Sequence, residues 1–353
     1  MLKKIFLILL CGAMGNCGAA PLPSIARTPP GPGPIHTANP HASKEARKLL
    51  RFLYSIQGKY TLSGMHNFLG KMSVYYDSVY AITGKHPAIW GGDFGFADST
   101  HDIDNIKYRP LLVPEIEKQY RNGAIIVMTY HQANPLIGEP CNFIGGVQSK
   151  MTDQQWKDLL TPGTPVYEAW RKQMDKLAAV FVQLRDKHIP VIFRPYHEMN
   201  GSWFWWGGRP GPQGSPGLYR QLFDYFTKNW KLNNILWAWT PDKPWPGISN
   251  FYPGPDYVDI LGSDIYPMQD TNVVYRQVWY DTMKVIANGK PLALTENSAA
   301  LTDTVLQTQP WLWFMSWANL LFFSTSPQAI RDLYANKKVL SREDLPDWKH
   351  MKD

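Results

Sequence analysis

The sequence predicts an α/β protein whose main domain is a (β/α)8 TIM barrel. Short apolar, β-branched runs alternate with longer amphipathic runs along the chain, as expected of strand–helix units around a parallel sheet. Eight such rounds can be counted, and no sequence repeat indicates a solenoid or a propeller. A Rossmann sheet is the structural alternative, but no glycine-rich phosphate turn follows a first strand, so the barrel is preferred.

The eight runs with the composition of barrel strands are 60–66, 87–93, 124–131, 190–196, 234–240, 258–266, 291–296 and 311–317. The clearest helical pattern extends from Val166 to Lys187, where apolar residues recur at three- and four-residue steps. Further helices are predicted over 216–231, 272–287 and 327–337. A long excursion, 132–165, follows the third strand and contains Phe143 and Trp156, so we expect a binding loop there.

The composition narrows the class of function. The chain has 353 residues, of which 44% are hydrophobic and 18% charged, so it can bury a large core and is not disordered over most of its length. Aromatic residues make up 14%, more than a core needs, which suggests that some rings serve a binding surface. The net charge is +7, but no basic cluster stands out, so nucleic acid is not an expected partner.

Residues 1–20 have the features of an export signal. Two lysines precede an apolar run over 5–10, and small residues follow. Nothing downstream supplies the roughly 20 apolar residues of a membrane-spanning helix. We therefore expect an exported bacterial protein that is periplasmic, secreted or a membrane-anchored lipoprotein.

Two processing routes remain open at this signal. Either Cys17 becomes the lipidated first residue of a lipoprotein, or cleavage falls near Ala19–Ala20. Membrane attachment is expected only through a lipidated Cys17. Residues 21–41 are rich in proline and glycine and predict a linker, so the domain is expected over 42–353. Cys141 is then the one cysteine in this domain, which excludes an intrachain disulfide.

Polar or aromatic residues stand at the carboxyl ends of seven of the eight predicted strands. They are His66, Asp93, His131, His197 with Glu198, Asp264 with Tyr266, Glu296, and Trp317. In a barrel, function collects at this end of the strands. Strand ends are polar in any fold, but two glutamates among histidines and tryptophans are not expected from solvent exposure alone.

Glu198 and Glu296 end the predicted fourth and seventh strands, so their side chains can face each other across the mouth of the barrel. Glycoside hydrolysis typically uses two carboxyl groups that flank the scissile bond. One acid protonates the leaving oxygen, and a carboxylate attacks the anomeric carbon. A lone glutamate at a strand end is usually solvated or salt-bridged. The presence of two such glutamates at facing strand ends favours a catalytic role for both.

An aromatic block, FRPYHEMNGSWFWWGG at 193–208, adjoins the first of these glutamates. Sugar rings stack their apolar faces on indoles, and we expect Arg194 and Asn200 to bind hydroxyl groups. The four successive rings at 203–206 cannot all face one way, so some of them pack in the core. A zinc site at His197 and Glu198 is not expected, because the metalloprotease pattern needs a second histidine where Gly201 stands. Neither a metal nor a cofactor is predicted.

The block resembles a known family, together with GSDIYP at 262–267 and TENS at 295–298. These strings are similar to glycoside hydrolase family 26, which includes β-mannanases, and the resemblance covers about residues 45–345. It implies that Glu198 is the acid/base and Glu296 the nucleophile. It also implies that five further residues surround the sugar, namely His131, His197, Trp203, Tyr266 and Trp317.

The resemblance implies a retaining endo-β-1,4-mannanase that hydrolyses mannan, glucomannan or galactomannan by double displacement. A mannobiose-releasing chain-end mannanase remains an alternative, as do a β-1,3-xylanase and a lichenase. A non-catalytic carbohydrate-binding protein is disfavoured, because a binder needs neither glutamate. Many relatives carry a Trp-Asp pair after strand three, whereas this chain reads CNFIGGVQSKM with Phe143 as the nearest aromatic residue. This departure leaves the choice between chain-end and mid-chain attack open.

Overall fold

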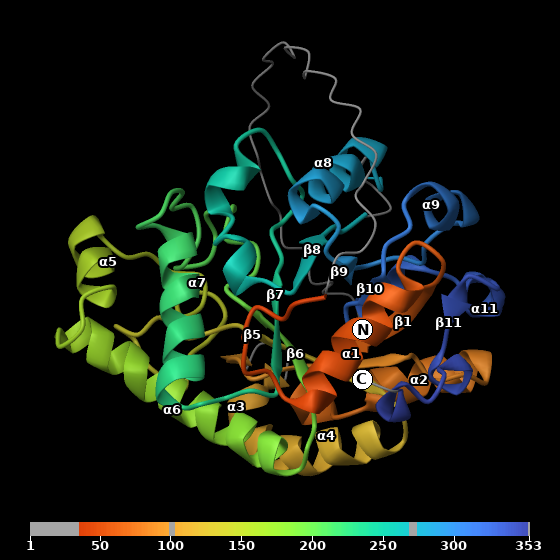
Figure 1. Cartoon of the computed structure of the whole chain (residues 1–353), viewed down its shortest axis with the longest axis horizontal. Helices are drawn as coiled ribbons and strands as arrows, with labels where there is room; N and C mark the ends of the chain where they lie inside the picture. The colour runs from red at the N-terminus through yellow and green to blue at the C-terminus, as the bar shows by residue number, and fades with distance from the viewer. Residues whose placement is uncertain (1–34, 99–102, 268–273, 352–353) are drawn as a thin grey trace, which may run out of the picture. The chain divides into compact units, whose positions relative to one another are not determined.

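The fold is a closed barrel of eight parallel strands surrounded by helices (Figure 1). The computed structural model describes residues 35–98, 103–267 and 274–351. The barrel strands are β1 (Thr61–His66), β2 (Ile89–Asp93), β5 (Ile125–Tyr130), β6 (Val191–Pro195), β7 (Ile235–Trp239), β8 (Ile260–Asp264), β9 (Leu292–Asn297) and β10 (Trp313–Ser316). Pairing of β1 with both β2 and β10 closes the ring. One strand lies in each of the eight segments predicted, and the TIM barrel is confirmed.

Helices fill the connections between the strands. They are α1 (Lys44–Ile56), α2 (Val74–Thr83), α3 (Asn105–Tyr108), α4 (Leu112–Arg121), α5 (Asp153–Leu159), α6 (Pro165–Asp186), α7 (Ser215–Asp224), α8 (Gln277–Ala287), α9 (Asp303–Thr308), α10 (Leu320–Ser324) and α11 (Pro327–Ala335). The longest, α6, is capped by Thr164, whose hydroxyl accepts the Tyr167 N–H, and has proline in its first turn.

The four predicted helices correspond to α6, α7, α8 and α11, with two differences at their ends. Helix α7 stops at Asp224, because the backbone widens there into a π-helical turn over Tyr225–Asn229. Helix α8 begins at Gln277, so the predicted start was too early for the residues described, and residues 272 and 273 lie outside the description.

Helix α1 closes the barrel at the end where the strands begin. Its buried residues, among them Leu49 and Phe52, form one apolar cluster with side chains of the barrel strands such as Leu62, Ile192 and Leu236. A second, larger apolar cluster includes inward-facing residues of α6 and α7. With the amino-terminal end covered, the carboxyl ends of the strands are the open face on which a site can be built.

Residues 38 and 39, at the end of the expected linker, make hydrogen bonds to the barrel. The Ala38 N–H donates to Asp259 at 2.6 Å, and the Asn39 side chain donates to the Leu232 carbonyl at 3.0 Å. Asn39 is buried, so these residues are part of the domain. The expected export signal, with Cys17, and residues 21–34 of the expected linker lie outside the described residues. In the described ranges, no helix combines the length and apolarity required to cross a bilayer.

Candidate active site

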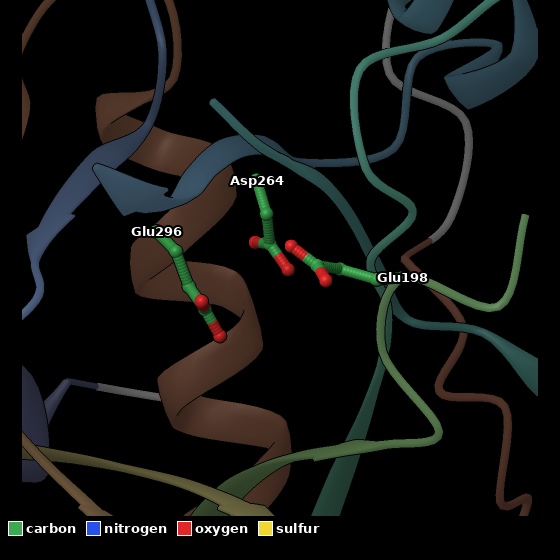
Figure 2. Close-up of side chains that lie close together, drawn as sticks. All are labelled: Glu198, Asp264 and Glu296. Atoms are coloured by element: carbon green, nitrogen blue, oxygen red, sulfur yellow. The ribbon is translucent and has the colours of Figure 1, made fainter. Parts of the chain in front are cut away.

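Three carboxyl groups converge at the open end of the barrel (Figure 2). Glu198 follows β6, Asp264 ends β8 and Glu296 lies in β9. One oxygen from each lies within 4.8 Å of the others. The fourth and seventh strands thus bring the two predicted glutamates to within reach of a single sugar residue, with Asp264 beside them.

Arg194 holds two of these carboxylates together from inside the barrel. Its Nη2 donates to Asp264 at 2.9 and 3.0 Å and to Glu296 at 3.0 Å, and its side chain is 1% exposed. Burial disfavours the charged guanidinium, but the Asp264 and Glu296 carboxylates outweigh burial and raise the pKa of Arg194. The Arg194 guanidinium donates to these acids and to the Thr240 hydroxyl, and its expected role toward sugar hydroxyls stays a prediction.

Glu296 is buried and has hydrogen-bond donors on both oxygens. The Tyr266 hydroxyl donates to Oε2, while Arg194 binds Oε1. His197 Nε2 lies 3.9 Å from Oε1. These contacts fix the direction of the carboxylate, and the cation stabilises its negative charge.

Glu198 lies in a different environment and is partly exposed. Its Oε2 accepts the Trp203 indole N–H at 2.6 Å. Burial raises the pKa of Glu198 well above its usual range, and the neighbouring charges of Asp242, Asp264 and Glu296 raise it further. The hydrogen bond from Trp203 acts in the opposite direction and lowers this pKa. The backbone of Glu198 has φ 51°, a strained value for a residue with a side chain, and its N–H donates to the Thr240 carbonyl at 2.7 Å.

Gly201 provides the space that lets Trp203 reach Glu198. A Cβ at Gly201 would lie 2.2 to 2.4 Å from three carbons of the Trp203 ring. The indole therefore folds over a position that any larger residue would obstruct. Asn200 supports the same turn, because its Oδ1 accepts the Asp242 N–H at 2.9 Å. Its expected role toward sugar hydroxyls stays a prediction.

Two histidines line the site next to Glu296. His131 Nδ1 bonds to the buried carboxylate of Asp93, and its Nε2 lies 3.0 Å from Nε2 of His197. Burial, aided by the positive charge of nearby groups, lowers the pKa of His197 well below its usual range, so this ring is neutral. Asp93 fixes His131 Nδ1 as the protonated nitrogen, because a carboxylate can only accept.

Trp317 stacks on His66, and together they form a flat wall beside the histidines. Their ring centroids are 3.6 Å apart and their planes differ by 9°. Burial lowers the pKa of His66 to about 3, so a neutral ring supports the indole. Trp317 is partly exposed, so some of its ring surface is accessible at the open end of the barrel.

The remaining aromatic residues divide between site and core. Trp205 and Trp206 are buried and donate to the carbonyls of Gln132 and His197, each at 2.8 Å. This confirms that part of the aromatic block packs inside. Of the two rings in the long excursion, Phe143 packs 5.6 Å from His131. Trp156 is buried on α5, with its N–H on the Gln213 carbonyl and no contact to the site residues.

Within the described part of the chain, Glu198, Asp264 and Glu296 are the one acidic, histidine or cysteine cluster with spacing suited to a metal ion. Arg194 already supplies a positive charge to two of these carboxylates, and Trp203 donates to the third. These contacts favour proton transfer and nucleophilic attack as the chemistry of the cluster, and the protein itself supplies the counter-charge.

Comparison with known proteins decides the family. The model of glycosyl hydrolase family 26 matches residues 38–344. The chain belongs to glycosyl hydrolase family 26. It is therefore a glycoside hydrolase. Relatives named mannan endo-1,4-beta-mannosidase include one from Thermothelomyces thermophilus, 28% identical over 95% of this chain and 69% of that protein. Another, from Bacillus subtilis, is 27% identical over 88% of this chain and 90% of that one.

Solved structures of family 26 proteins share the fold. GH26A from Muricauda sp. MAR_2010_75 is 35% identical, with a TM-score of 0.80 over 87% of this chain and 99% of its own. A β-mannanase from a symbiotic protist of the termite Reticulitermes speratus, complexed with gluco-manno-oligosaccharide, is 26% identical, with a TM-score of 0.76 over 89% of this chain and 98% of its own.

The structure of this family 26 glycosidase brings all the predicted site residues to one end of the barrel. These residues are His131, His197, Glu198, Trp203, Tyr266, Glu296 and Trp317. Asp242 was missed, although its charge acts on Glu198. The fifth predicted strand was the one strand without an assigned polar terminus, and Asp242 is the first acidic residue after it. The missing polar terminus of the fifth predicted strand was therefore the feature of the sequence that could have pointed to Asp242.

Replacing Arg194 by methionine should destabilise the protein by about 3–5 kcal/mol at pH 7, because two buried carboxylates lose their cation. The loss should shrink toward pH 4. Burial raises the pKa of Asp264 and Arg194 lowers it, so without the cation this pKa rises further and the penalty of the ionised Asp264 grows as pH rises through the acidic range. Urea unfolding at both pH values measures the effect.

Arg185→Met is the matched control, since Arg185 pairs with Asp186 at 2.9 Å on the surface and should contribute little. A loss for Arg194→Met that equals the control, or one that is independent of pH, would contradict the account of the buried cation.

Proposed function

We propose that this family 26 glycosidase is a retaining endo-β-1,4-mannanase, with Glu296 as nucleophile and Glu198 as acid/base. The separation of the two carboxylates carries the proposal, since an oxygen of each lies within 4.8 Å of the other. Retaining enzymes place their carboxyl groups about 5–5.5 Å apart, whereas inverting enzymes need roughly 6.5–9.5 Å to admit a water molecule.

In the first step, a Glu296 oxygen attacks the anomeric carbon while the bond to the leaving oxygen breaks. Glu198 gives its proton to that oxygen, and its raised pKa keeps this proton bound to a higher pH than on an ordinary glutamate. In the second step, water attacks the same carbon, Glu198 takes the water proton and Glu296 is released. Arg194 and Tyr266 stabilise Glu296 as the departing carboxylate.

The proposed substrate is β-1,4-mannan or glucomannan, in line with the names of the relatives and of the protist enzyme. Mannose differs from glucose in its axial 2-hydroxyl, and contacts to this group strengthen in the transition state. We assign His131 and Trp203 to it, because Trp203 donates to Glu198 and His131 contacts His197, which lies 3.9 Å from Glu296. A mannobiose-releasing mode, and β-1,3-xylanase or lichenase activity, are the alternatives.

Release of reducing sugar from mannan, glucomannan, xylan and lichenan tests this function. We expect kcat/KM on mannan or glucomannan to exceed that on xylan and lichenan by at least about tenfold, because the site selects the axial hydroxyl through rate. Glu296→Ala controls for contaminating hydrolases. Equal rates on lichenan and mannan would refute the specificity and leave the glycosidase intact.

Trp203→Phe should move the alkaline limb of the kcat/KM profile to higher pH. The indole N–H lowers the pKa of Glu198, so its removal raises that pKa and extends the range in which the acid is protonated. Trp205→Phe is the control, because its N–H binds the Gln132 carbonyl. An unmoved or lowered limb in Trp203→Phe would count against Glu198 as the acid.

We also propose that the protein is exported, on the strength of residues 1–20, with Cys17 as the residue that decides membrane attachment. Cys17→Ser should move the enzyme from the membrane fraction to the soluble fraction if Cys17 is lipidated. An unchanged distribution in cell fractionation would reject the lipoprotein route.

A further inference from the structure

The end of the barrel where the strands begin carries mainly basic side chains. Among the four residues before each barrel strand, all of which the structure describes, acids occur only before β8, as Asp256 and the buried Asp259. Lysines occupy these positions before five of the strands, namely Lys59, Lys85, Lys187, Lys231 and Lys290. The opposite end holds the three converging carboxyl groups of the active site. The two ends of the barrel therefore differ in charge.

Helix α1 covers the basic end and bears a row of cations on its outer side. Lys44, Arg47, Lys48 and Arg51 recur at three- and four-residue steps, so they share one face of the helix. The buried residues of α1 lie on the opposite face, against the barrel. The Lys44 side chain is 66% exposed. We call these four residues the α1 cations.

Helix stability explains the lysines before the strands but does not explain the α1 cations. The loops before the strands follow helices, and the partial negative charge at the carboxyl end of a helix favours cations there. Lys187 after α6 and Lys290 after α8 fit this explanation. Lys44, in contrast, is the first residue of α1, where the charge of the helix disfavours a cation, and the last turn of α1 has no basic residue.

Ion pairs offset only part of the charge at this end. Lys44 lies 3.8 Å from Glu45, and Lys187 pairs with Glu117 at 2.7 Å. Pairs of this kind at a surface are weak. Within the described ranges, neither Lys48 nor Lys231 has an acid at ion-pair distance, and Lys48 donates to the Lys349 carbonyl at 3.3 Å. These cations can therefore attract an anionic partner.

The chain enters the domain at the same end. The Ser43 N–H, at the start of α1, donates to the Asn233 carbonyl at 2.7 Å, two residues from Lys231. Residues 18–34 separate Cys17 from the described domain, and a chain of that length spans at most about 60 Å. An anchor at Cys17 would hold the domain near a membrane by the end that carries the α1 cations.

We propose that the α1 cations and Lys231 form a binding surface for the anionic headgroups of membrane phospholipids. The beginnings of the strands then face the membrane, and the catalytic end faces away from it toward the polysaccharide. Clusters of lysine and arginine near a membrane are attracted to anionic lipids. The inference rests on the proposed export, which brings the protein to a membrane. The sequence predicted attachment only through Cys17, and this surface adds a second contact.

The competing explanation is that the net positive charge of the whole chain attracts it to any anionic surface, with no preferred face. Under that explanation, removal of any three exposed lysines would weaken binding to the same extent. Under the proposal, the position of the lysines decides the loss. Two triple variants that change the net charge equally separate the explanations.

The experiment measures co-sedimentation with vesicles of phosphatidylcholine alone and of phosphatidylcholine mixed with phosphatidylglycerol. The parent protein is the full chain with Cys17→Ser, which removes the expected lipidation site. The test variant adds Lys44→Gln, Lys48→Gln and Lys231→Gln. We expect the parent to prefer the phosphatidylglycerol vesicles, and the test variant to bind them at least about tenfold more weakly, because three cations next to the lipid phosphates are lost. Added salt should release the parent.

The matched control adds Lys107→Gln, Lys157→Gln and Lys172→Gln to the same parent. These lysines are exposed and lie in α3, α5 and the first half of α6, away from the beginnings of the strands. All three proteins share residues 1–34, so any binding by that segment is common to them. The control should bind like the parent. Equal losses in the two variants would overturn the surface, as would a parent that binds both kinds of vesicle equally.

Mannan hydrolysis by the bound enzyme tests the orientation. The parent should hydrolyse mannan as fast on phosphatidylglycerol vesicles as in free solution, because its open face is turned away from the lipid. Loss of hydrolysis on binding would overturn the orientation, since the catalytic end would then be covered. Absence of mannan hydrolysis by the free parent would instead reject the proposed mannanase, and the vesicle comparison would still decide whether the lipid-binding surface exists.

Discussion

The site depends on a buried cation, Arg194, at the centre of the barrel. Its guanidinium donates to Asp264 and Glu296 and is shielded from water by the strands around it. This charge offsets much of the cost of holding the Asp264 and Glu296 carboxyl groups close together in a region of low dielectric. The barrel supports the arrangement because β6, β8 and β9 each bring one member to the same end of the sheet.

The two glutamates differ because their surroundings differ. Glu296 has a cation on one oxygen and a hydroxyl donor on the other, so its charge is satisfied. Glu198 has one indole donor and faces three other acids, and burial together with these charges raises its pKa. The proposed double displacement requires two carboxyl groups in such different surroundings, one to attack and one to give a proton. The strained backbone at Glu198 and the open space at Gly201 serve this arrangement.

The strands and the site face could be predicted from the sequence, because both depend on local patterns. Apolar runs mark the strands, and polar residues after them mark the open end. The partner of Arg194 could not be predicted, since it depends on residues 70 and 102 positions away. The sequence alone does not distinguish an arginine that pairs with buried carboxylates from one that binds a sugar hydroxyl.

Two other features of the site could not be predicted from the pattern of strands. Asp242 lies three residues beyond the end of β7 and outside the predicted strand, which ended at residue 240. The bond from Trp203 to Glu198 needs a tight turn at Gly201, which becomes apparent only once the chain has folded.

Trapping of the covalent intermediate tests the central claim most directly. In a 2-deoxy-2-fluoro-β-mannosyl fluoride, the fluorine at C2 slows both steps and the fluoride leaving group speeds the first, so a glycosyl-enzyme should accumulate in a retaining enzyme. Peptide mass spectrometry should then locate the sugar on Glu296. A label on Glu198 or Asp264 would contradict the assignment of the nucleophile, and turnover that yields the inverted anomer with no label would contradict the retaining mechanism.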